Sequence, residues 1–97
     1  MALSYDESAN LMRDATFVSR VKVACLKYAA YIFDEANTVP AHASRLRWAQ
    51  GVQLNPDSAA MQVVPAVVMD ASVQDGGAGI ADDVLQSAVE TTLNKQM

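Results

Sequence analysis

The chain has 97 residues, of which 52% are hydrophobic and 19% charged, and its net charge is −4. This length predicts one domain, and the composition is too apolar for a disordered protein. There is no run of about 18 uncharged apolar residues, and the first residues have neither the basic nor the apolar region of a secretory signal, so we expect no membrane span and no signal peptide. The single cysteine and single histidine exclude an internal disulfide and the usual zinc sites.

The charges are divided unevenly along the chain. Every lysine and arginine except Lys95 lies within residues 1–50, whereas residues 51–94 carry only acidic charges. Such charges mostly form a solvated surface. The division also fits subunits that meet head to tail, with the basic side of one against the acidic side of the next.

A short helix is predicted over about residues 5–13. Ser4 and Glu7 have the spacing of a capping box, in which each side chain bonds to the backbone of the other. Leu11 and Met12 are the apolar contacts of this helix. Asp14 then provides a cap for the next helix.

The next helix, over about residues 15–36, is the longest that the sequence predicts. Its apolar residues recur at spacings of three and four, and we expect one stripe of them in the core: Val18, Val21, Cys25, Tyr28 and Ile32. Further apolar residues cover most of the remaining surface, leaving one narrow polar stripe of residues seven apart: Arg13, Arg20, Lys27 and Asp34. A helix of this kind is the centre of a bundle or is shared between subunits. Asn37 is suited to a left-handed C-cap.

A third helix is predicted from Pro40 to about residue 53, because proline is favoured at the first helical position. Its inward residues are expected to be Leu46, Ala49, Val52 and Trp48, and its outward residues Arg45 and Arg47.

A fourth helix is predicted over about residues 56–70. Asn55 is a good N-cap and Pro56 a good first residue. Pro65 lies inside this helix, where it removes one backbone hydrogen bond, so we expect a kink or a break. Since residues 63–69 are also rich in valine, a β-strand is the alternative.

A flexible glycine-rich loop is predicted over residues 71–79, before a fifth helix over about 82–95. Asp82 and Asp83 suit the first turn of a helix. The apolar stripe of the fifth helix is expected to contain Val84, Leu85, Ala88, Val89 and Leu93. The prediction is an all-α fold, a small bundle of four to five helices with a long central helix at about 15–36.

The sequence contains no motif of a catalytic, cofactor or metal site. A pairing of Cys25 with His42 is the one nucleophilic arrangement available, but Cys25 lies on the apolar stripe and is better explained as a core residue. We therefore expect no enzyme activity, no cofactor and no bound metal.

Arg45, Arg47 and Trp48 form the most noticeable candidate for a protein interface, since arginine and tryptophan are frequent in interface hot spots. The alternative is that Trp48 packs into the core and the arginines are solvated. A DNA-reading helix-turn-helix is disfavoured by the acidic balance.

Several segments, in this order and spacing, resemble small virion morphogenesis proteins of tailed bacteriophages. They are Phe17–Ala24, Ala30 to Glu35, Arg45–Ala49, Asn55–Pro56 and Asp83–Val89. The resemblance covers about residues 5–93. It implies a head-to-tail connector or adaptor subunit, which forms a ring in the neck of the virion below the portal and is assembled in the host cytoplasm.

The partners implied by this resemblance are further copies of the chain, the portal protein and neighbouring neck and tail proteins. Genomic DNA would pass through the ring without sequence-specific contact. The residues expected at the interface between subunits are Arg13, Arg20, Lys27, Arg45, Arg47 and Trp48. The alternatives are a capsid decoration protein, an assembly factor that leaves the particle, and a small acidic regulator that binds a host protein or DNA.

Overall fold

The computed structural model describes residues 10–40, 42–70 and 80–96. Within these ranges the chain forms four helices, α2 (Ala15–Ala36), α3 (Ala43–Leu54), α4 (Pro56–Met69) and α5 (Asp82–Gln96), after a helical turn at residues 10–13. The predicted all-α fold with its long central helix is confirmed. The capping box at Ser4 and Glu7 and the glycine-rich loop at 71–79 lie outside the described residues.

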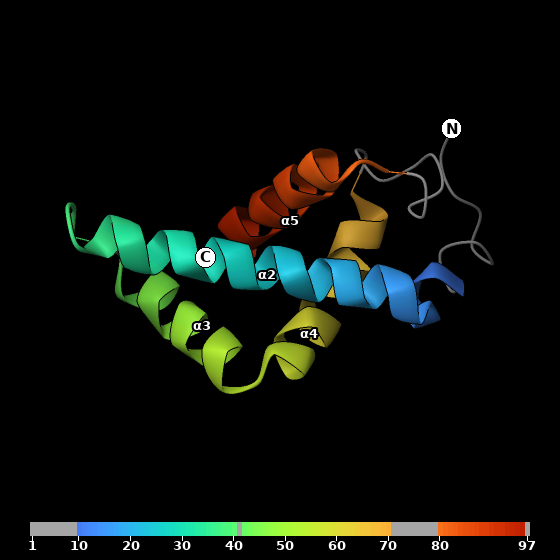
Figure 1. Ribbon diagram of the computed structural model, residues 1–97, viewed down its shortest axis with the longest axis horizontal. Coiled ribbons are helices and arrows are strands. Elements are labelled where there is room, and N and C mark those ends of the chain that lie inside the picture. Colours follow the sequence, from blue (N-terminus) through green and yellow to red (C-terminus); the bar gives the residue numbers. More distant parts are fainter. Residues whose placement is uncertain (1–9, 41, 71–79, 97) are drawn as a thin grey trace.

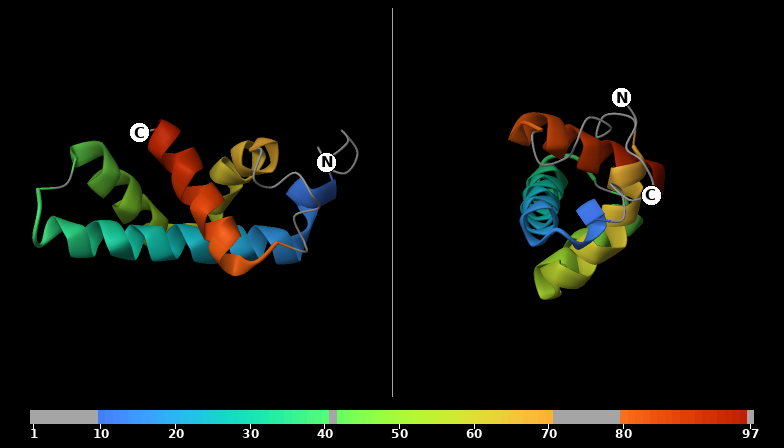
Figure 2. Two further views of the ribbon diagram at one scale, coloured as in Figure 1. Left: turned by 90° about the horizontal axis from the view of Figure 1, so that it is seen from above. Right: turned by 90° about the vertical axis from the view of Figure 1, so that its right-hand side faces the viewer.

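The other helices are arranged around α2, which runs along the longest dimension of an elongated molecule of 42 × 22 × 20 Å (Figure 1). α3, α4 and α5 each pack against α2, and α4 also contacts α3 and α5. Seen from above, α3 and α4 lie to one side of α2, and α5 crosses over α2 with its first turn reaching the opposite side (Figure 2). One long side of α2 therefore faces away from the other helices.

α2 begins as predicted, because Asp14 accepts a hydrogen bond from the backbone N–H of Phe17 at 2.8 Å. Four of the five residues expected in the core are buried, and the fifth, Val18, is half-buried. All the buried residues of α2 are Phe17, Val21, Ala24, Cys25, Tyr28, Ala29 and Ile32. The prediction for Asn37 is wrong. Its φ of −76° and ψ of −19° are right-handed, because the helix ends in a tightened turn in which the N–H of Asn37 donates to the carbonyl of Asp34 at 3.2 Å.

α3 begins at Ala43 with His42 as its N-cap residue, so the predicted start at Pro40 is wrong. Proline only tolerates the first helical position, and His42 makes no side-chain hydrogen bond to the backbone of the first turn, so no capping side chain determines where this helix starts. Ala49 and Val52 are buried, as expected. Leu46 and Trp48 pack partly against the core, again as expected.

α4 begins as predicted, with Asn55 Oδ1 accepting from the backbone N–H of Ser58 at 3.1 Å and Pro56 in the first turn. The helix continues through Pro65 to Met69, so neither the break nor the alternative strand occurs. Pro65 removes only the N–H that would meet the carbonyl of Met61, and the surrounding turns are held by packing. The buried residues of α4 are Ala60, Val63, Val64, Val67 and Val68.

α5 closes the core through Leu85, Ala88, Val89 and Leu93. Val84 was expected on the same stripe but is exposed. Gln86 fastens the helix to α2 by donating from Nε2 to the carbonyl of Ala24 at 3.2 Å. Among the described residues, no helix combines the length and apolar character needed to cross a membrane.

Candidate functional site

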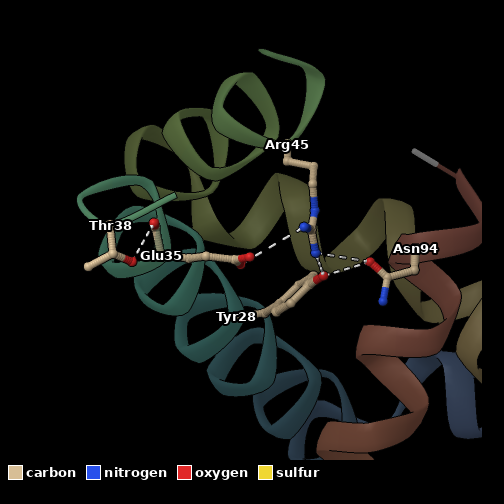
Figure 3. Close-up of polar contacts among 5 residues, drawn as sticks. All are labelled: Tyr28, Glu35, Thr38, Arg45 and Asn94. Carbon is tan, nitrogen blue, oxygen red and sulfur yellow. Dashed lines mark hydrogen bonds and ion pairs between the residues drawn. The ribbon is translucent and has the colours of Figure 1, made fainter. Parts of the chain in front are cut away.

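A polar cluster joins α2, α3 and α5 (Figure 3). Tyr28 on α2 donates its hydroxyl hydrogen to Oδ1 of Asn94 on α5 at 2.6 Å. Arg45 on α3 donates to the same hydroxyl oxygen, and to Oδ1 of Asn94 at 3.3 Å. Residues that lie far apart in the sequence thus share one small network of hydrogen bonds.

Contacts with Tyr28 and Glu35 stabilise the positive charge of Arg45. Its hydrogen bond to Tyr28 raises the pKa of the guanidinium above its ordinary value, and Glu35 adds a favourable charge with an Oε2 atom 4.0 Å from Nη1. The guanidinium carbon also lies 5.7 Å from the centre of the Tyr28 ring. Arg45 therefore does not point outward as predicted, because its donors are used within the subunit.

Trp48 lies beside the same cluster rather than on an open surface. Its ring centre is 5.9 Å from that of Tyr28 at an angle of 52°. Tyr31 also stacks on Tyr28, with ring centres 6.1 Å apart and 11° between the ring planes. This aromatic group lines the α2–α3 contact and stabilises the position of α3.

Two ion pairs link the basic first half of the chain to its acidic second half within one subunit. Nη2 of Arg20 lies 3.0 Å from Oδ1 of Asp82 at the start of α5, and the guanidinium also donates to the carbonyl of Ile80. Nζ of Lys22 lies 3.0 Å from Oδ1 of Asp57 at the start of α4. Each carboxylate lies in the first turn of its helix, where it also complements the helix dipole.

The six predicted interface residues therefore fall into two groups. Arg20, Arg45 and Trp48 make contacts within the subunit. The remaining three, Arg13, Lys27 and Arg47, are exposed, and none forms an ion pair with another described residue. Their role at an interface stays a prediction.

Cys25 and His42 lie in opposite environments. Cys25 is fully buried, and this burial raises the pKa of its thiol from 9.0 to about 12. His42 is exposed at the start of α3. A thiol so protonated is a poor nucleophile, which favours the role of Cys25 as a core residue. Within the described ranges no group of three or more His, Cys, Asp or Glu side chains could hold a metal ion.

An apolar stripe on the outward side of α2 consists mainly of the further apolar residues that the sequence places outside the core stripe. This outer α2 stripe comprises Ser19, Val23, Leu26, Ala30 and Phe33. Val23 is 47% exposed and Leu26 36%, and Phe33 is half-buried. The spacing of four and three residues is that of a helix-packing seam.

A second exposed apolar stripe runs along the outward side of α4. This outer α4 stripe comprises Ser58, Met61, Pro65 and Met69. Met61 is 55% exposed and Met69 72%. Exposed methionines adapt well to a partner surface, because their side chains are flexible and polarisable.

No protein-family model, no curated protein and no solved structure matches the chain. A function is therefore inferred from the two stripes, the ion pairs and the polar cluster.

Proposed function

We propose that the protein is a structural protein of a tailed bacteriophage virion, a head-to-tail connector subunit that forms a ring below the portal. The observation that carries the proposal is the pair of outer stripes, on α2 and α4, which remain exposed although the chain has a well-formed core. Exposed apolar surface beyond scattered single residues is typical of protein interfaces. The resemblance to phage morphogenesis proteins supplies the biological setting.

The internal contacts suit a building block of this kind. The ion pairs of Arg20 and Lys22 and the cluster around Tyr28 fix α3, α4 and α5 against α2, so that surfaces on different helices keep a constant geometry. A ring requires such rigidity, because a small change of angle at each contact accumulates around it. A surplus of carboxylates suits a channel for DNA, since it repels phosphates.

The test is the number of copies in purified particles, measured by quantitative mass spectrometry against the portal protein. Roughly a dozen copies, a ring matched to the portal, supports a connector. Hundreds of copies would indicate a decoration protein, and absence from the particle would indicate an assembly factor or a regulator. Either of these results contradicts the proposal.

A second experiment concerns the exposed basic residues. Because Arg45 belongs to the polar cluster, reversing it would disturb the fold, so the informative variant is Lys27→Glu with Arg47→Glu. We expect each single reversal, Lys27→Glu and Arg47→Glu, to bind portal-bearing heads more weakly than Lys95→Glu, a matched single reversal on α5, and the double variant to bind more weakly still. Equal binding and equal completion of particles would show that these residues are only solvated.

A further inference from the structure

The first turn of α3 has little local support. His42, the N-cap residue, makes no side-chain hydrogen bond to the backbone, and Ala43 and Ser44 are exposed. The buried residues of this helix, Ala49 and Val52, lie in its second half. Because caps and packing against the core are what usually hold a helix end in place, the first turn of α3 depends on contacts made by its longer side chains.

Two side chains of this turn reach the rest of the molecule. Leu46 packs partly against the core, and Arg45 extends its guanidinium to the hydroxyl oxygen of Tyr28 on α2. Tyr28 is only 2% exposed, so its hydroxyl has little water available as an alternative partner. Polar groups buried to this extent are normally hydrogen-bonded within the protein. The bond between Arg45 and Tyr28 is therefore the polar anchor of the start of α3.

The acceptor for the hydroxyl hydrogen of Tyr28 comes from α5. Tyr28 donates to Oδ1 of Asn94 at 2.6 Å, and Arg45 donates to the same oxygen at 3.3 Å. Figure 3 shows the side chains of Arg45 and Asn94 converging on the hydroxyl from two different helices. A hydroxyl that donates to one partner becomes a better acceptor for another, so the bond from Tyr28 to Asn94 strengthens the bond from Arg45 to Tyr28.

Asn94 thus connects two helices that are attached to the bundle separately. α3 packs against α2 and α4, and α5 also packs against α2 and α4. If the last turn of α5 moves away, Tyr28 loses the acceptor of its hydroxyl hydrogen and Arg45 loses one of its acceptors. Arg45 then holds the start of α3 less firmly. The converse also follows, because an energetic coupling between two sites is reciprocal.

We propose that Asn94 acts as a latch between α5 and α3, so that docking of the last turn of α5 fixes the first turn of α3. Opening at one of these turns then favours opening at the other, and a partner that binds and stabilises one turn also stabilises the other. Arg45 and Asn94 are positioning residues in this device. The inference does not depend on the proposed function.

The test measures amide hydrogen exchange in the full-length protein by NMR. The reporter for α3 is the amide of Leu46, which donates to the carbonyl of His42 at 3.1 Å in the first turn. Asn94→Ala should raise the exchange rate of this amide roughly fivefold, the factor that corresponds to one hydrogen bond. Asn94→Asp keeps an oxygen acceptor and places a negative charge near Arg45, so it should leave this rate unchanged or lower it.

Lys95→Ala is the matched control, because it truncates an exposed neighbour of Asn94 on the same turn of α5. This control should leave the exchange of Leu46 unchanged. In the reverse direction, Arg45→Met keeps an apolar stem but removes the guanidinium, and it should raise the exchange rates of amides in the last two turns of α5 by a similar factor. Urea unfolding of each variant distinguishes local opening from global unfolding, because local opening requires less free energy.

A double-mutant cycle gives a second, independent measurement. We expect Arg45→Met combined with Asn94→Ala to lose less stability than the sum of the two single losses, because either change alone already breaks the latch. Two results would each overturn the inference: additive losses of stability, or a Leu46 amide that exchanges at the same rate in Asn94→Ala and Lys95→Ala. Either would show that Arg45 and Asn94 are separate surface contacts.

Discussion

The buried thiol of Cys25 makes the stability of the fold depend on pH in the alkaline range. Burial raises its pKa from 9.0 in the unfolded chain to about 12 in the folded protein. The folded state therefore holds the proton more tightly than the unfolded state does. The contribution to stability is complete below pH 9 and is lost progressively as the pH rises toward the folded value.

The magnitude follows from this difference. At pH 10 most unfolded chains have an ionised thiol, while the folded protein, about two units below its own pKa, still keeps the proton. Linkage then lowers the free energy of unfolding by about 1.4 kcal/mol at pH 10 relative to pH 7. The loss approaches a limit of about 4 kcal/mol above pH 12, at 1.36 kcal/mol for each unit of pKa difference.

The assay is urea unfolding of the wild type and of Cys25→Ala at pH 7 and pH 10. The two proteins differ only at residue 25, so the effects of pH on the rest of the chain cancel in the comparison. We expect Cys25→Ala to be the less stable protein at pH 7, because it leaves a small cavity, and to recover by about 1.4 kcal/mol relative to the wild type at pH 10. An unchanged difference between the two proteins would refute the reasoning and place the thiol in contact with water.

Three further predictions concern stability and are checked by thermal or urea unfolding. Asp14→Ala should cost about 1 kcal/mol, because it removes the acceptor for the N–H of Phe17, whereas Asp14→Asn should cost little. Gly51→Ala should raise stability by about 0.5–1 kcal/mol, since glycine weakens a helix and an added Cβ at this position meets nothing within 4 Å; a loss of stability would contradict the exposed helical environment. Tyr28→Phe should cost about 1–3 kcal/mol by leaving Arg45 and Asn94 without their shared partner, and a neutral result would show that the cluster adds nothing to stability.

The helices whose ends carry strong local signals were predicted closely. Asp14 and Asn55 have side-chain oxygens that bond to nearby backbone N–H groups, so their effect depends only on a few neighbouring residues. Pro40 was misleading because proline tolerates the first helical position without creating a cap. The left-handed conformation expected at Asn37 failed for a similar reason, since a propensity does not decide between two ways of ending a helix.

The arrangement of polar groups could not be predicted in the same way. Tyr28 and Asn94 are 66 positions apart, and Arg20 and Asp82 are 62 apart. Their contacts depend on the angle at which α5 crosses α2, and no local pattern encodes this angle. By contrast, the apolar stripe of α2 that faces the core was predicted correctly apart from Val18, because the spacing of its residues is a local pattern.

The attachment of α5 has a consequence for the order in which the chain folds. α2, α3 and α4 follow one another with short connections, and the ion pair between Lys22 and Asp57 joins residues 35 positions apart, whereas the hydrogen bond between Gln86 and Ala24 spans 62 positions. Closing a longer loop costs more entropy and delays the contacts that depend on it. We therefore expect the three earlier helices to assemble first and α5 to dock last, and to be the first to detach. Native-state hydrogen exchange should show the amides of α5 exchanging through a smaller opening than those at the centre of α2, and equal protection of both helices would mean that the whole bundle forms in one step.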